Sequence, residues 1–124
     1  MEHKMGFQNT DTGFHLTFEN GYTISVQWGR MNYCQAKGNS DNLYKDLDNS
    51  ADYSRTAEIA AWNPEGKFMH LGEYDDVVGW LSSDEVAQYI TVLSGSEPEK
   101  AIYLSWPGGR FKSTKDTVTS WLGL

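Results

Sequence analysis

The sequence predicts an α+β fold: a single-layer antiparallel sheet of about five strands, built around two hairpins, with one or two helices packed on one face. Three observations support this fold class. Residues 14–18 and 22–28 alternate apolar and polar side chains around a turn, residues 56–71 repeat that arrangement, and residues 83–94 show helical spacing. The chain of 124 residues can bury a core without a disulfide or a metal.

We expect one domain over residues 1–124, because no internal linker divides the chain. Residues 1–12 are polar and show no strand or helix periodicity, so we expect them to be a loose N-terminus. This segment lacks the apolar run of a signal peptide. No stretch of the sequence approaches the roughly 20 apolar residues of a membrane span, so no membrane partner is expected.

The register of the first hairpin can be derived from its apolar pattern. A two-residue Asn20-Gly21 loop would place the two apolar rows on opposite faces of the hairpin. A three-residue loop over 19–21 instead pairs Leu16 with Ile24 and brings both rows to one face. Because one face must be buried, we expect a type I turn followed by Gly21 in the left-handed conformation.

The second hairpin is predicted to consist of a strand over 56–62, a turn over 63–66 and a return strand over 67–71. Proline at the second turn position and glycine at the fourth fit a type I turn. The same register rule pairs Ile59 with Leu71, which brings their side chains to one face of the hairpin.

A helix is predicted over residues 83–94. Ser82 and Glu85 have the spacing of a capping box, and Gly95 suits the C-terminal cap. Apolar side chains recur along one face of this helix at three- and four-residue intervals. Such a stripe predicts that the helix packs against the sheet.

The remaining segments carry weaker signals. Residues 29–54 are polar and predict a long functional loop, or a loop with a short helix near 41–47. Residues 72–81 are expected to be an acidic connector, residues 101–106 a further strand, and residues 114–122 a short helix.

Composition and charge exclude several classes of function. The net charge of −7 disfavours a general attraction to nucleic acid phosphates, so no direct nucleic-acid binding is expected. Between residues 41 and 85 there are eleven acidic and three basic residues, which form either a solvated face or a surface for a basic partner. The single cysteine, Cys34, cannot form an internal disulfide, which fits a reducing cytoplasm.

Candidate chemical groups are few. The histidines, His3, His15 and His70, lack metal-ligand spacing, no HExxH or CxxC motif occurs, and neither a metal nor a cofactor is expected. A cysteine enzyme would need His15 or His70 beside Cys34. Glu58 interrupts an otherwise apolar strand, and it either faces solvent or has a function.

Residues 18–29, FENGYTISVQWG, are followed by Asn-Tyr-Cys at 32–34, and the runs 57–62, 76–81 and 84–86 come later in the chain. Together, and in this order, these runs resemble small uncharacterised proteins encoded by bacteriophages and prophages. The first run is moderately specific, and together the runs cover about a quarter of the chain. The resemblance implies a setting, the cytoplasm of an infected bacterium, and no particular reaction.

In that setting we predict a non-enzymatic accessory protein that acts by stoichiometric contact with a bacterial host protein, such as a defence or regulatory factor with a basic surface. The residues expected to bind this partner are Gln27, Arg30, Asn32, Tyr33 and Asp76. They combine polar, aromatic and acidic contacts, the types found in protein interfaces. The high aromatic content is also compatible with a homodimer.

Two other function classes stay open. A protein that sequesters a nucleotide or another small molecule would need a pocket that joins two of Arg30, Arg55 and Arg110 with a Trp or Tyr. A small cysteine-dependent enzyme would present Cys34 beside a histidine in a cleft. Burial of Cys34 among apolar side chains would argue against that enzyme.

Overall fold

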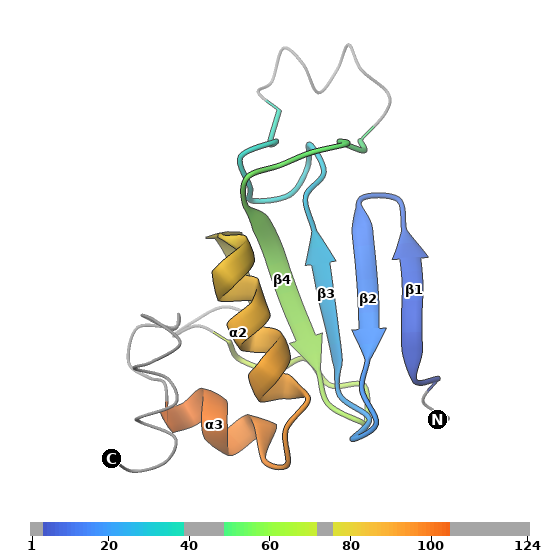
Figure 1. Ribbon diagram of the computed structural model, residues 1–124, viewed down its shortest axis with the longest axis vertical. Coiled ribbons are helices and arrows are strands. Elements are labelled where there is room, and N and C mark those ends of the chain that lie inside the picture. Colours follow the sequence, from blue (N-terminus) through green and yellow to red (C-terminus); the bar gives the residue numbers. More distant parts are fainter. Residues whose placement is uncertain (1–3, 39–48, 72–75, 105–124) are drawn as a thin grey trace.

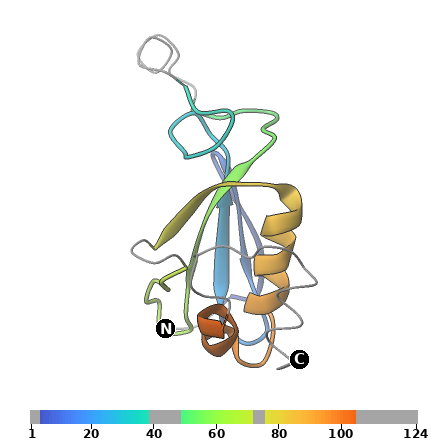
Figure 2. The ribbon, with the colours of Figure 1, turned by 90° about the vertical axis from the view of Figure 1, so that its left-hand side faces the viewer.

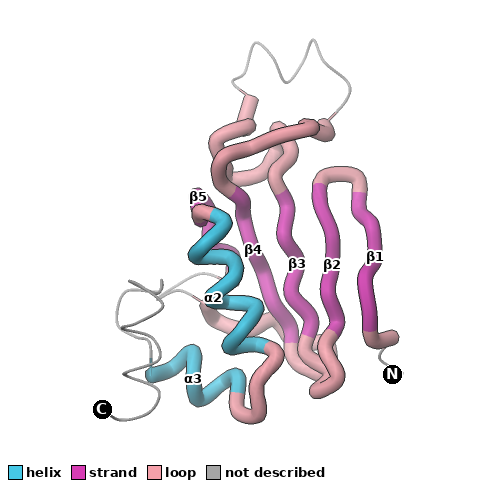
Figure 3. The backbone as a smooth tube through the Cα atoms, viewed as in Figure 1, coloured by secondary structure: helices cyan, strands magenta, loops and turns pink. Residues whose placement is uncertain are grey.

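The computed structural model describes residues 4–38, 49–71 and 76–104, and it has the predicted α+β architecture (Figure 1). Its elements are β1 (Gly6–Thr10), β2 (Gly13–Thr17), β3 (Thr23–Gln27), β4 (Ala57–Trp62), β5 (Val77–Leu81), α2 (Ser83–Leu93) and α3 (Pro98–Leu104). Each strand pairs antiparallel with the next, which gives a five-stranded sheet of order β1-β2-β3-β4-β5 (Figure 3). No helix in the described ranges is long and apolar enough to cross a membrane.

Helix α2 covers one face of the sheet and makes the core with it (Figure 2). It packs against β3, β4 and β5. Its largest buried side chain is Tyr89, which is 1% exposed. Further core residues include Ile24, Val26, Ile59, Ala61, Leu81, Val86 and Leu93. Burial of this apolar face provides most of the stabilisation of a fold of this size.

The first hairpin confirms the predicted register. Phe14 lies opposite Val26 and Leu16 opposite Ile24, so both apolar rows face α2. The amide of Gly21 donates to the carbonyl of Phe18 at 2.8 Å, and Gly21 has φ +88°. This left-handed residue closes the three-residue loop in the predicted manner.

The turn of this hairpin also caps the far end of α2. Asn20 Nδ2 donates to the carbonyls of Leu93 and Gly95, at 2.8 Å each, while Asn20 Oδ1 accepts from the amide of Tyr22. The last carbonyls of a helix lack partners within the helix. One side chain therefore joins the β2–β3 turn to the C-terminus of α2.

At its start, α2 has the predicted capping box. The amide of Glu85 donates to Ser82 Oγ, and the amide of Ser82 donates to Glu85 Oε1. The helix ends within one residue of the predicted position, with Ser94 as its C-cap and Gly95 after it, but Gly95 does not have a positive φ. The amides of Ser94 and Gly95 donate to the carbonyls of Ile90 and Val92, and the Asn20 side chain donates to that of Leu93.

Two strands were not predicted. The segment 1–12, expected to be loose, contains β1, which pairs with β2 over its whole length. The segment 72–81, expected to be an acidic connector, contains β5 as the outer neighbour of β4. Both are edge strands, which receive their order from main-chain pairing with a neighbour and show weak periodicity of their own.

The second hairpin is confirmed only near its turn. Gly66 donates to the carbonyl of Asn63, and the return segment keeps one bridge, between Trp62 and Phe68. The predicted pairing of Ile59 with Leu71 is wrong, because Ile59 pairs with Val78 of β5. Each position on one edge of β4 can pair with a single strand, and β5 pairs with residues 57–60. Leu71 instead enters the core.

The predicted strand over 101–106 is also wrong where the structure describes it, because residues 101–104 belong to α3. Pro98 opens this helix, and Glu99 lies in its first turn, a start that favours helix. A short apolar run cannot distinguish a helix from a strand. The helices predicted near 41–47 and over 114–122 lie outside the described residues.

Candidate functional site

Strand β5 contains a bulge that exposes a tryptophan at the edge of the sheet. Leu81 pairs with Ala57 and Val78 with Ile59, so the two residues Gly79 and Trp80 lie opposite one residue of β4. Trp80 has φ +59° and is 51% exposed. A bulky residue in this conformation is strained, and such strain is concentrated at functional sites. The bulge therefore marks a candidate site.

An open hollow lies beside this bulge. We call it the β5 hollow; its volume is about 440 Å³, and it is lined by Tyr33, Asp76, Val77, Gly79 and Trp80. Tyr33 is 55% exposed, so the hollow presents two large aromatic side chains to solvent. Tyr33 comes from the loop after β3, and the other four residues come from β5 and the residue before it.

Glu58 holds the loop that carries Tyr33. Glu58 Oε2 accepts from the Tyr33 amide at 2.7 Å, and Glu58 Oε1 accepts from Asn32 Nδ2 at 3.3 Å. Asn32 Oδ1 in turn accepts from the amide of Gly29. The acidic residue that interrupts the pattern of β4 thus faces this loop. Its function in the structure is to position the β3–β4 loop against β5, since charge-assisted hydrogen bonds are among the stronger ones.

The loop and the bulge also touch directly. The amide of Trp80 donates to the carbonyl of Tyr33 at 2.8 Å. A Cβ atom at Gly79 would lie 2.5 Å from Tyr33 Cβ and 2.8 Å from Tyr33 O. Only glycine allows this approach without a shift of the backbone. The wall of the β5 hollow is therefore built by main-chain contacts, and the aromatic rings are left at the surface.

The charges around the hollow are mixed. Asp76 Oδ1 lies 3.1 Å from His70 Nδ1. Lys37 Nζ lies 5.0 Å from the centre of the Tyr33 ring, a cation–π contact. With Asp76 in its wall and Glu58 behind the loop, the hollow has a carboxylate beside an aromatic ring. This combination suits a cationic side chain from a partner.

Two of the five predicted binding residues line the β5 hollow, and the other three do not. Tyr33 and Asp76 meet in the β5 hollow, although they are far apart in the sequence. Asn32 supports the loop through Glu58, and the amide of Arg30 donates to the carbonyl of Asn49.

Gln27 lies within the sheet. Its side-chain oxygen accepts from the hydroxyls of Thr10 and Thr12, and its Nε2 donates to Ser25 Oγ at 3.0 Å. These bonds cross β3 and the β1–β2 turn, so the Gln27 side chain joins neighbouring strands and does not line the hollow.

Val77, Gly79 and Trp80 were missed by sequence reasoning. A glycine followed by tryptophan inside a short apolar run is the one signal that could have indicated a bulge, since glycine within a strand often marks one. The exposure of Trp80 could not be derived, because it depends on which residue of β4 lies opposite.

The alternative sites have weaker support. Cys34 is fully buried, and its thiol points to the carbonyl of Gly29, so it is not presented for catalysis. His15 packs edge-to-face on Trp62 with ring centres 5.1 Å apart, and burial lowers the pKa of His15 below 6.5. In the described ranges no group of three or more His, Cys, Asp or Glu side chains could hold a metal ion.

Neither the β5 hollow nor a second hollow, lined in part by Trp28 and Arg55, joins two of the predicted arginines with a Trp or Tyr. Arg30 lines neither of these two hollows, and Arg110 lies outside the described residues. The acidic stretch of 41–85 also lies partly outside them.

Comparison with known proteins leaves the family open. No family model matches the chain, and no curated protein or solved structure matches it significantly.

Proposed function

We propose that this chain is a non-enzymatic binding protein that acts by stoichiometric contact with a bacterial host protein through the β5 hollow. The observation that carries the proposal is the strained, half-exposed Trp80 beside the half-exposed Tyr33. Tryptophan and tyrosine are the residues most enriched among those that dominate binding energy in protein interfaces. A backbone that holds both rings at the surface is pre-organised for such contact.

The proposed partner presents a basic surface. Asp76 lines the hollow, and the chain as a whole carries a net charge of −7. Complementary charge accelerates encounter and disfavours acidic competitors. Lysine or arginine side chains of the partner would place their cations against the Tyr33 and Trp80 rings, as Lys37 already does within the chain. In the setting that the phage resemblance implies, the partner is a host defence or regulatory protein.

The test is affinity capture from bacterial lysate with the tagged wild type, a Tyr33→Ala/Trp80→Ala double variant and a Phe7→Ala control. Phe7 is 90% exposed on β1, at the opposite edge of the sheet, so its removal deletes an exposed aromatic ring away from the hollow. We expect one host protein to be retained by the wild type and by the control and lost by the double variant. The rate at which this host protein associates with the wild type should fall as the salt concentration is raised.

Three outcomes would overturn the proposal: equal capture by all three chains, loss of capture in the Phe7→Ala control, or retention of a nucleotide with no protein. Thermal unfolding of each variant separates a lost contact from a lost fold. A further variant, Gly79→Ala, keeps both aromatic side chains but forces the Tyr33 loop away from β5. It should weaken capture because the two rings would no longer hold their relative positions.

A further inference from the structure

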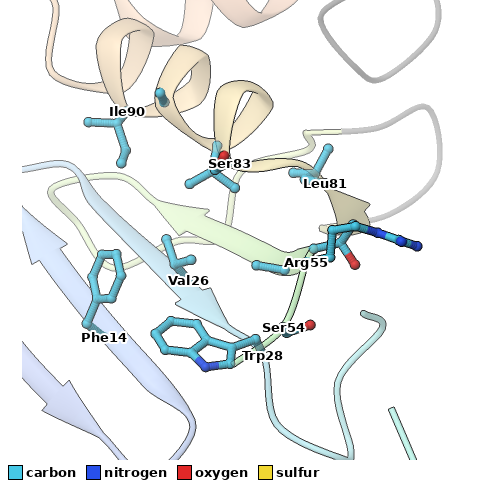
Figure 4. A pocket seen from close by; sticks show the side chains of 12 residues that line it. Phe14, Val26, Trp28, Ser54, Arg55, Leu81, Ser83 and Ile90 are labelled. Atoms are coloured by element: carbon cyan, nitrogen blue, oxygen red, sulfur yellow. The ribbon is translucent and has the colours of Figure 1, made fainter. Parts of the chain in front are cut away.

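A second cavity lies on the opposite side of β4, between the sheet and the first half of α2. We call it the α2 groove; its volume is about 270 Å³ (Figure 4). It is lined by Phe14, Val26, Trp28, Ser54, Arg55, Thr56, Ala57, Leu81, Ser83, Val86, Ala87 and Ile90. The groove shares no residue with the β5 hollow. Its volume is close to the lower end of the range of ligand pockets, roughly 300–1,000 Å³.

Most of the wall is apolar. Phe14 and Trp28 pack edge-to-face with ring centres 6.1 Å apart, and Ile90 of α2 lies across from Phe14 in Figure 4. The Trp28 indole N–H donates to the carbonyl of Ala51 at 3.0 Å, which fixes the plane of the ring. Water finds few hydrogen-bond partners in such a space. This part of the groove therefore suits an aromatic or branched aliphatic group.

One end of the groove is polar and cationic. Ser54, Arg55 and Thr56 line this end. The side chain of Arg55 extends outward, away from Phe14 and Trp28 (Figure 4). Ser54 Oγ already accepts from the amide of Ala36, and Thr56 Oγ1 accepts from the amide of Gln35. Each hydroxyl therefore keeps one proton that it can donate to a ligand. Donors and a cation at one end of an apolar cavity select an anionic group.

The first turn of the neighbouring helix has a positive dipole end and two carboxylates. The groove reaches Ser83, the first residue of α2, where the helix dipole is positive. Asp84 and Glu85 lie in the same turn but do not line the groove. Glu85 accepts from the amide of Ser82, which holds its carboxylate in the capping box. Arg55 is thus the charged residue that lines the groove.

We propose that the α2 groove binds a small amphipathic anion, with an aromatic or branched apolar body against Phe14, Trp28 and Ile90 and a carboxylate at Arg55. This ligand is independent of the protein partner at the β5 hollow. Such a ligand would match both the apolar walls of the cavity and its single charged end. It also predicts that a neutral ligand of the same shape binds less tightly.

The test compares naphthalene-2-carboxylate with its neutral carboxamide by calorimetry and by amide and indole NMR shifts of the full chain. We expect the carboxylate to bind the wild type and to shift the Trp28 indole resonance, and the carboxamide to bind about three- to five-fold more weakly. Arg55→Gln should remove that difference. Ala87→Leu should weaken both ligands at least about tenfold, because the exposed helix position gains a side chain that fills the groove.

The outcomes distinguish the elements of the proposal. Failure of both ligands to bind would overturn it, as would equal binding of the two by the wild type. Unchanged binding in Ala87→Leu would place the ligand elsewhere and overturn the assignment to the groove. Capture of the host protein by the Arg55→Gln variant should be unaffected, so failure of this proposal and failure of the proposed function can be told apart.

Discussion

The left-handed conformation of Trp80 predicts that glycine is more stable than alanine at this position, the reverse of the usual order in a strand. In most strand positions glycine is less stable than alanine by about 0.5–1 kcal/mol, because glycine loses more conformational freedom on folding. At φ +59° a non-glycine residue pays about 1–2 kcal/mol for contact between Cβ and the following carbonyl. Glycine removes that cost. Trp80→Gly should therefore be more stable than Trp80→Ala by about 0.5–1 kcal/mol.

The pair of variants isolates the backbone term. Both remove the indole ring, so its lost packing cancels in the comparison, apart from one methyl group. The assay is urea unfolding followed by far-UV circular dichroism, because tryptophan fluorescence changes with the substitution itself. A matched control is Ala60→Gly in β4, at a position without positive φ, where glycine should lower the free energy of unfolding by about 0.5–1 kcal/mol.

If glycine is more stable than alanine at position 80 and less stable than alanine at position 60, the result would support backbone strain at Trp80. If glycine were less stable than alanine at position 80 as well, the conformation of Trp80 would carry no cost. The bulge would then be no indication of function. If both Trp80 variants were as stable as the wild type while capture of the partner was lost, the ring would be retained for binding and not for folding.

Two further predictions concern stability. Asn20→Asp keeps the acceptor for the Tyr22 amide, but it removes both donors to the end of α2 and adds a negative charge there. The free energy of unfolding, measured with urea, should therefore fall by about 2–3 kcal/mol. A variant as stable as the wild type would show that these bonds to α2 do not stabilise the fold. Burial lowers the pKa of His15, so the unfolded chain binds more protons near pH 6.5, and stability should be full above that pH and decline as the pH falls through it. His15→Gln should flatten this decline, whereas parallel curves for the two chains would contradict the assignment.

The parts of the fold that depend on neighbours along the chain could be predicted from the sequence. The register of the first hairpin followed from the demand that Leu16 and Ile24 share one buried face, and the capping box of α2 followed from the spacing of Ser82 and Glu85. Both are local: a few residues carry the whole pattern. The fold class followed in turn, because hairpins and an amphipathic helix have few ways to bury their apolar faces.

Which distant segments pack together is visible only in the folded chain. Two segments, residues 67–71 and β5, could pair with the same edge of β4. Strand β5 pairs with most of this edge, because Val78 and Leu81 are buried against the core there. That choice created the bulge, exposed Trp80 and brought Asp76 beside Tyr33. In the folded chain, Glu58 accepts a hydrogen bond from the amide of Tyr33 and so holds the loop that carries this residue. Such contacts join residues far apart in sequence, and periodicity reports only how one segment is buried, not the partner that buries it.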